Sequence, residues 1–152
     1  MEKIKPLKFN QESYDTHDSM GKKILSDYLE SIGYQILSSV EDYGHDIIAQ
    51  KPGEEPKYFE VEIKNSYPFT SKESFKFNTV SFLGRKMRLH NIKPFIYVIV
   101  CSYTGYAICL ESDRIFLDKY IEKIHINTNM RQGLDTMFRV PKNLCKFFKI
   151  SI

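Results

Sequence analysis

Hydrophobic and polar positions follow two different periods along the chain, and the change from one to the other predicts the order of the elements. From residue 19 to residue 32 the apolar side chains recur every three to four positions, which predicts an amphipathic helix that ends at Gly33. Asp18 or Ser19 can serve as its N-cap. Residues 34–38 are then expected to form a short strand, so the helix is predicted to pack on a sheet.

The clearest strand signal lies in residues 57–64, where apolar and polar side chains alternate. Residues 46–50 have the character of a preceding strand, and the stretch 51–56 contains the Pro and Gly residues of a turn. Residues 46–64 are therefore predicted to form a β-hairpin. On its second strand one face carries Phe59, Val61 and Ile63, and the other carries Tyr58, Glu60, Glu62 and Lys64.

Beyond the hairpin the pattern predicts a loop at 65–78. Residues 79–91 are either a strand followed by a helix or one continuous helix. A buried strand at 94–102, a neighbouring strand at 106–111, a helix from 112 to about 123, and short helical or strand pieces at 134–152 are then expected. This order predicts an α/β fold with a mixed central β-sheet flanked by helices. We expect one domain over 1–152, with a core at about 18–125, an arm or short helix at 1–16 and a C-terminal cover at 126–152.

The positions of the charged residues along the chain say more about the function than the overall composition or the net charge does. Of the 152 residues, 42% are hydrophobic and 27% charged, which is typical of a globular protein, and the net charge of +3 does not identify a partner. No acidic residue occurs in 74–110 or in 136–152, whereas carboxylates concentrate in 41–62. Carboxylates beside basic segments suit a metal site near a polyanion. The alternative is that these segments are simply solvated faces.

Cysteine usage and hydropathy bear on the compartment. The chain has three cysteines and no CxxC pair, which fits a reducing, cytoplasmic setting, and Cys101 and Cys109 are expected to be small core residues. The N-terminal segment has no apolar signal core, and no run of about 18 apolar residues occurs. We therefore expect a cytoplasmic protein without a membrane span.

Three polar side chains of the predicted hairpin are the candidates for catalysis: Asp46, Glu62 and Lys64. Glu62 and Lys64 are two positions apart in a strand and therefore project from the same face. A hairpin loop centred near residue 54 would pair position 46 with about position 62, which brings two carboxylates together on neighbouring strands. Two carboxylates at that distance repel each other unless a cation lies between them.

A divalent metal would satisfy this arrangement. Mg²⁺ takes carboxylate oxygens together with water and phosphate oxygens, so Asp46 and Glu62 are predicted to bind Mg²⁺ or Mn²⁺, with the backbone carbonyl of Ile63 completing the shell. The metal would polarise a phosphate and activate a water, which Lys64 would orient or deprotonate. The alternative is an exposed strand face on which Glu62 and Lys64 only form an ion pair. Glu60 is either an outer ligand or, as we expect, a residue at the wet end of the strand.

The segments GHDIIAQ and YFEVEIKNS together resemble the PD-(D/E)xK, or restriction-endonuclease-like, nuclease superfamily, which includes restriction enzymes, Holliday junction resolvases and many phage nucleases. The pattern of that family is an Asp that opens one strand, here Asp46, and (D/E)-x-K on the next, here Glu62-Ile63-Lys64, after a helix that ends in Gly and an aromatic residue, here Gly33 and Tyr34. The resemblance implies a restriction-endonuclease-like core and a metal-dependent nuclease in which Asp46, Glu62 and Lys64 are catalytic.

The resemblance also sets two further expectations. Many members carry a glutamate on the first helix, but this place falls near Gly21 and Lys22, with Asp18 and Asp27 as candidate substitutes. Members often use basic residues after the catalytic strand to contact phosphates, and here Arg85, Lys86 and Arg88 are the candidates.

Three functional hypotheses follow. The first is a Mg²⁺-dependent endonuclease that hydrolyses phosphodiester bonds in DNA, with a homodimer favoured where two strands are cut. The second is a nuclease-fold protein that binds nucleic acid with weak or no turnover. The third is a structural or interaction protein, such as one from a phage or mobile element, in which Glu62 and Lys64 only form an ion pair. Other chemistries lack support, because HExxH, GxxxxGK[ST] and GxSxG motifs are absent from the sequence.

Overall fold

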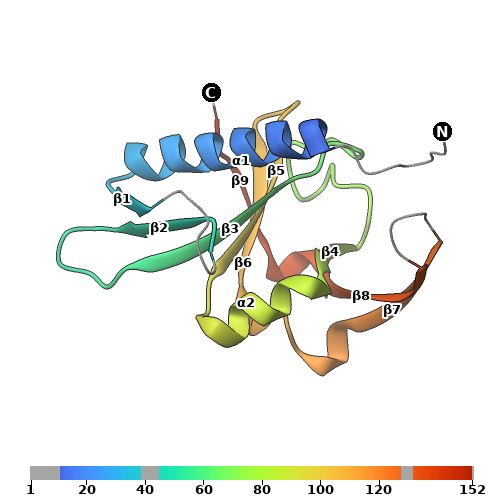
Figure 1. Ribbon diagram of the computed structural model, residues 1–152. Helices are drawn as coiled ribbons and strands as arrows, with labels where there is room; N and C mark the ends of the chain where they lie inside the picture. Colours follow the sequence, from blue (N-terminus) through green and yellow to red (C-terminus); the bar gives the residue numbers. More distant parts are fainter. Residues whose placement is uncertain (1–10, 39–44, 128–131, 152) are drawn as a thin grey trace.

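A computed structural model describes residues 11–38, 45–127 and 132–151. Its main sheet has six strands, and Figure 1 shows α1 (Gln11–Ser31) lying across one face of that sheet. The spatial order is β1 (Gln35–Ser38), β2 (Ile47–Gln50), β3 (Lys57–Ile63), β5 (Ile96–Cys101), β6 (Tyr106–Glu111) and β9 (Lys146–Lys149). All neighbours are antiparallel except β3 and β5, which run parallel. The protein is therefore mixed α/β with a mixed sheet.

The first helix ends where its sequence requires. Gly33 has a φ of +103°, a left-handed conformation that glycine adopts without strain. The N–H of Tyr34 donates to the carbonyl of Leu29 at 2.9 Å, which closes the helix in a Schellman-type turn. The apolar side of α1, with Leu25 and Leu29, packs on β2, β3 and β5, so one core layer lies between this helix and the sheet.

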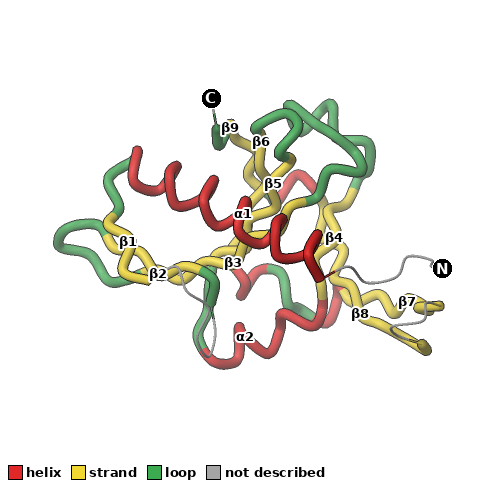
Figure 2. Tube along the Cα trace, turned by 45° about the horizontal axis from the view of Figure 1, so that its top comes forward, coloured by secondary structure: helices red, strands yellow, loops and turns green. Residues whose placement is uncertain are grey.

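A second, three-stranded antiparallel sheet packs on the other side. It has the order β4 (Thr79–Leu83), β8 (Gln132–Pro141) and β7 (Ile121–Asn127). The chain reaches β5 from β4 through the 3-10 helix η1 (Gly84–Lys86) and the short α2 (Met87–Ile92). Figure 2 shows this sheet and α2 on the side of the main sheet opposite α1. The larger apolar core fills the space between them, with Phe82, Tyr97 and Phe138 among its fully buried side chains.

Several predicted elements are confirmed. The hairpin, the buried strand and its neighbour form β2–β3, β5 and β6, and residues 79–91 form a strand followed by helix rather than one continuous helix. Cys101 is buried and Cys109 half-buried, in agreement with their expected place in the core. The C-terminal residues contribute strands, of which β9 covers the edge of the main sheet next to β6.

Two predictions about helices were wrong. The first helix spans Gln11–Ser31, so neither Asp18 nor Ser19 is its N-cap. Residues 11–16, expected to be an arm or a short helix, are helical and continuous with it. The helix expected from 112 to about 123 is replaced by two 3-10 turns and by β7. The β-branched side chains at 121, 124 and 126 favour a strand, and pairing with β8 is the long-range contact that local sequence does not reveal.

Candidate functional site

The register of the hairpin determines which carboxylates meet. Ile47 pairs with Phe59 and Ala49 with Lys57, so position 46 lies opposite Glu60 and not opposite Glu62. The expected register was therefore wrong by two residues, because the loop is centred at residue 53 and not 54. The residue that joins Asp46 is Glu60, whose carboxylate Oε2 accepts a hydrogen bond from the Asp46 amide at 2.8 Å.

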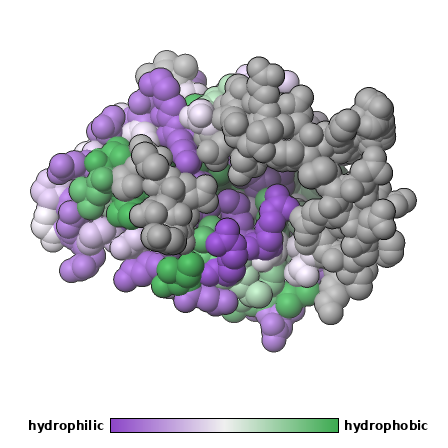
Figure 3. Space-filling model, viewed as in Figure 1, coloured by the Kyte–Doolittle hydropathy of each residue, from purple (hydrophilic) through white to green (hydrophobic). Residues whose placement is uncertain are grey.

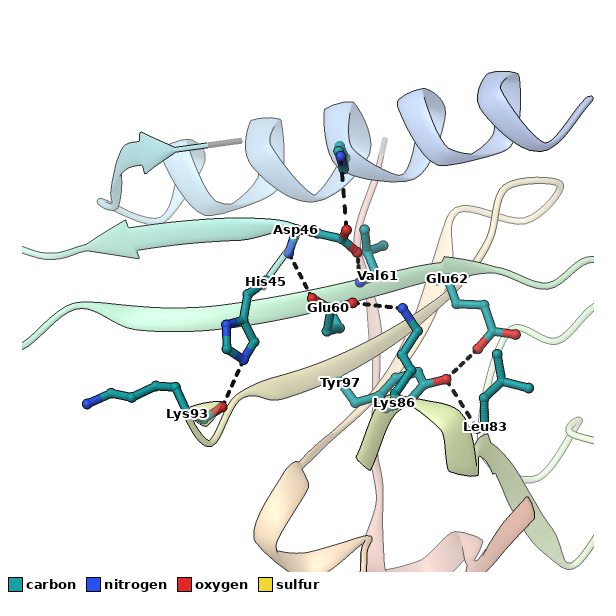
Figure 4. A network of polar contacts seen from close by, with 10 residues as sticks. His45, Asp46, Glu60, Val61, Glu62, Leu83, Lys86, Lys93 and Tyr97 are labelled. Atoms are coloured by element: carbon teal, nitrogen blue, oxygen red, sulfur yellow. Dashed lines mark hydrogen bonds and ion pairs between the residues drawn. The ribbon is translucent and has the colours of Figure 1, made fainter. Parts of the chain in front are cut away.

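Asp46 itself lies buried at the start of β2, against the neighbouring edge of β3. Its Oδ2 accepts a hydrogen bond from the N–H of Val61 at 3.1 Å, and its Oδ1 lies 4.0 Å from Nζ of Lys22 on α1 (Figure 4). The Asp46 carboxylate thus continues the β2–β3 ladder where the backbone pairing of β2 ends.

Glu60 is completely buried, contrary to the expectation that it lies at the wet end of the strand. Its Oε1 accepts a hydrogen bond from Nζ of Lys86 at 2.7 Å. Burial raises the pKa of Glu60 to about 7, an effect that Lys86 opposes and the charge of Asp46 reinforces. Burial alone would lower the pKa of Lys86, but Glu60 and Asp46 more than compensate, so that pKa is raised as well.

Glu62 and Lys64 lie side by side, as expected from their spacing. Nζ of Lys64 is 3.8 Å from Oε2 of Glu62 and donates to the carbonyl of Ser81 on β4 at 3.1 Å. The hydroxyl of Tyr97 donates to Oε1 of Glu62 at 2.8 Å and accepts the N–H of Leu83 at 3.3 Å. Burial, followed by the charge of Glu62, raises the pKa of Tyr97, so this hydroxyl remains a donor. Figure 4 shows Asp46 between α1 and β3 and Glu62 on the opposite side of β3.

The backbone of Ile63 faces the edge of β3 at which Asp46 lies. The N–H of Lys64 donates to Val100 of β5 at 2.8 Å, so alternate residues of β3 direct their N–H and C=O groups toward β5. Val61 and Ile63 consequently direct theirs to the β2 side, where the paired register of β2 extends only to Phe59. The Ile63 carbonyl is therefore an oxygen donor on the same edge as the Asp46 carboxylate.

The carboxylates of Asp46 and Glu62 and the carbonyl of Ile63 are oxygen donors of the kind that Mg²⁺ prefers. Mg²⁺ takes waters and phosphate oxygens as its remaining ligands. Within the described ranges, no group of three or more His, Cys, Asp or Glu side chains is close enough together to hold a metal ion. In this structure the three carboxylates contact lysines instead: Asp46 with Lys22, Glu60 with Lys86 and Glu62 with Lys64. A metal would therefore bind in competition with ammonium groups.

The resemblance to PD-(D/E)xK nucleases set the expectation of a carboxylate near Gly21 and Lys22, and the structure has the cation Lys22 there. Lys22 faces Asp46, while Asp27 is on the exposed side of α1, where it pairs with Lys23 at 3.0 Å. Asp27 therefore does not replace the missing carboxylate, and the side chain of Asp18 lies outside the described residues.

The three basic candidates for phosphate contacts separate into two kinds. Arg85 and Arg88 are exposed, whereas Lys86 points inward to Glu60. Figure 3 shows hydrophilic residues in the middle of the face that lies between α1 and α2. Lys86 thus lies among the carboxylates of Asp46, Glu60 and Glu62, a group that we call the acid cluster. The two arginines are the exposed cations of residues 85–88.

Ser112, Cys109 and Cys145 are poorly suited to act as nucleophiles. Ser112 is fully buried, and its hydroxyl is held by His90 Nδ1 at 2.6 Å and by the N–H of Phe95 at 2.9 Å. Burial raises the pKa of Cys109 to about 11 and that of Cys145 to about 12, so both thiols stay protonated at neutral pH.

Comparisons of the chain with protein-family models, with curated proteins and with solved structures give no match. The function must therefore be argued from the site. None of the described helices has the length and apolar character to cross a membrane.

Sequence reasoning missed the central parts of the cluster. The alternation along β3 put Glu60 on the face of Glu62, and a loop centred one residue earlier would have paired it with Asp46. Tyr97 lies within an apolar run and Lys86 within a basic run, and neither gives a local signal of its partner.

Proposed function

We propose that this protein is a Mg²⁺- or Mn²⁺-dependent nuclease of restriction-endonuclease-like fold that hydrolyses phosphodiester bonds in DNA. The observation that carries the proposal is the contact of the Asp46 carboxylate with the Val61 N–H, at 3.1 Å. It holds a buried carboxylate beside the Glu62-Ile63-Lys64 segment, on the edge that the Ile63 carbonyl also faces. Carboxylates are seldom buried unless they are paired or coordinate metals.

Each residue has a defined task in this proposal. Asp46 and the Ile63 carbonyl, at one edge of β3, and Glu62, from the other side of that strand, would hold the metal, which supplies charge neutralisation and an activated water when bound. Lys64 would orient that water, because its ammonium lies beside Glu62 and is fixed from the other side by the Ser81 carbonyl. Tyr97 holds the Glu62 carboxylate, and Arg85 and Arg88 are available for phosphates. Cutting both strands of a duplex favours a homodimer, since each chain has one such site.

A specific observation favours a second candidate, a nucleic-acid-binding protein of the same architecture without turnover. All three carboxylates have lysine partners, and Asp46 and Glu62 contact groups on opposite sides of β3. In this second candidate the lysines balance the carboxylates permanently, and the exposed arginines supply the affinity for phosphates.

Cleavage and metal binding separate the two candidates. Labelled linear, nicked, branched and single-stranded DNA would be incubated with the protein in Mg²⁺, in Mn²⁺ and in EDTA. We expect metal-dependent cutting that falls at least about 100-fold in Asp46→Asn and in Lys64→Met. Asn at position 46 retains an oxygen that accepts the Val61 N–H, so this variant should fold.

Lys57→Met is the matched control, because Lys57 lies exposed at the other end of β3. Its cutting rate should equal that of the wild type. DNA binding without cutting and without metal dependence would support the second candidate instead. Cutting at the wild-type rate by Lys64→Met would remove Lys64 from the mechanism.

A further inference from the structure

A cleft of about 400 Å³ opens directly beside Lys64, between the 64–78 loop and the strands β4, β5 and β8. Four aromatic rings line it on the loop side: Tyr67, Phe69, Phe75 and Phe77. Tyr67 and Phe77 are 46% and 40% exposed, and their rings meet edge to face with centroids 4.8 Å apart. An exposed aromatic ring offers a surface on which another flat ring can stack.

Cations surround this aromatic surface. Lys64 and Arg139 line the cleft, and each has a carboxylate partner, Glu62 at 3.8 Å and Glu122 at 2.8 Å. Nζ of Lys76 lies 5.0 Å from the Tyr67 ring and 5.7 Å from the Phe77 ring. The segment 74–110, which supplies most of this wall, contains no acidic residue. An aromatic floor with a cationic rim is complementary to a ligand that joins a flat base to a phosphate.

We infer that this cleft binds one unpaired nucleobase of a single-stranded segment of the nucleic acid, stacked on the ring face of Tyr67 and flanked by the perpendicular ring of Phe77, with the adjoining phosphate toward Lys64. The inference rests on the proposed function, since it assigns a substrate class to the same site. It makes the preferred substrate a single strand, a flap or a branch rather than an uninterrupted duplex.

Size and geometry favour an unpaired base over a duplex. A cleft of about 400 Å³ holds a small flat ligand. A duplex presents base edges in its grooves and keeps its base faces stacked, so it offers no ring face to Tyr67. Lys64 connects the cleft with the acid cluster, because its ammonium lies 3.8 Å from Glu62 and 3.1 Å from the Ser81 carbonyl, and Ser81 itself lines the cleft.

The test measures binding of a single-stranded oligonucleotide with one 2-aminopurine, and of the matching duplex, to the full chain in EDTA. Stacking quenches 2-aminopurine, so we expect quenching with the single strand and about tenfold weaker binding of the duplex. Tyr67→Ala and Phe77→Ala should each weaken single-strand binding about tenfold and abolish the quenching. Tyr67→Phe retains the ring and should bind as the wild type does.

Tyr103→Ala is a further control, because this exposed ring lies outside the lining of the cleft. Equal affinity for both DNA forms, or unchanged binding by both alanine variants, would overturn the inference. Quenching and selective binding without metal-dependent cutting would leave the cleft assignment intact and refute the nuclease proposal. If both alanine variants retain metal-dependent cutting of single-stranded DNA, the nuclease proposal stands and the cleft assignment is refuted.

Discussion

Glu60 and Lys86 form an ion pair of 2.7 Å between β3 and the 3-10 helix that precedes α2, with the Glu60 side chain withdrawn from solvent. The pair joins the hairpin that carries Asp46 to the crossover between β4 and β5. Withdrawing both charges from water costs about as much as their attraction returns, so such a pair contributes little net stability. Its place beside Asp46 is better explained by the proposed site, because it keeps a carboxylate and a cation at fixed positions.

Replacing Lys86 by Met should destabilise the fold by about 3 kcal/mol, because the carboxylate of Glu60 would stay buried without its partner. Urea unfolding at pH 8 measures this loss. Lys23→Met is the control, since Lys23 pairs with Asp27 at 3.0 Å with side chains 78% and 61% exposed. That change should cost less than about 1 kcal/mol. A loss in Lys86→Met no larger than in Lys23→Met would contradict the burial of the pair.

The raised pKa of Glu60 predicts a specific dependence of stability on pH. The folded protein keeps this proton up to a pH of about 7, whereas the unfolded chain releases it near the ordinary value of 4.5. The native state therefore binds more protons in this window, and its free energy of unfolding should fall as pH rises from about 4.5 to about 7. Glu60→Gln cannot titrate, so it should remove this component of the slope.

Comparing the wild type with Glu60→Gln separates the titration of Glu60 from that of other groups that titrate between pH 4.5 and 7. Burial lowers the pKa of His45, which contributes stability that is lost as pH falls below its ordinary value of 6.5, opposite in sign to Glu60. His45 is unchanged in Glu60→Gln, so its contribution cancels in the difference between the two unfolding profiles. Parallel profiles across pH 4.5–7 would show that Glu60 titrates alike in the folded and unfolded states.

Local sequence patterns were sufficient to predict those elements whose structure depends mainly on their own residues. The alternation of 57–64 and the Pro and Gly of the turn predicted the hairpin, and the apolar spacing with Gly33 predicted the end of the first helix. Lys64 beside Glu62 followed from the period of a strand alone.

The rest of the site depends on contacts that local sequence does not encode. A displacement of one residue in the centre of a turn moves the pairing partner by two, so Asp46 meets Glu60 instead of Glu62. Lys86 lies in a run of basic residues that reads as a solvated face, and its inward direction is fixed by the crossover between β4 and β5. The second sheet arises from pairing of β4 with β8, more than 50 residues later.

Substitution of Gly84 and of Gly21 by alanine should have different effects on the stability of the fold, which tests the packing on both sides of the main sheet. A Cβ on Gly84 would lie 2.6 Å from the carbonyl oxygen of Thr136, so Gly84→Ala should destabilise the fold by about 1–3 kcal/mol. A Cβ on Gly21 would lie 3.4–3.5 Å from Val61 and Ile63, an ordinary contact within a helix. Gly21→Ala should therefore be neutral or stabilise by up to about 1 kcal/mol. Thermal unfolding of both variants measures the difference, and equal losses would contradict the packing described.

Tyr97→Phe tests whether the acid cluster is organised for a metal or only for stability. The hydroxyl of Tyr97 donates to Glu62 and accepts the Leu83 N–H, so its removal leaves a half-buried donor without this acceptor and should cost about 1 kcal/mol. Tyr103→Phe, at an exposed ring, should cost nothing measurable.

The metal dependence of cutting distinguishes the two roles of Tyr97. If Tyr97 positions Glu62 as a ligand, the Mg²⁺ concentration for half-maximal cutting by Tyr97→Phe should rise by about tenfold, as for other groups that orient metal ligands. The maximal rate at saturating Mg²⁺ should change less, because the ion still binds when its concentration is high. A loss of stability with an unchanged Mg²⁺ dependence would mean that Tyr97 only joins β5 to the end of β4 and does not position Glu62 as a metal ligand.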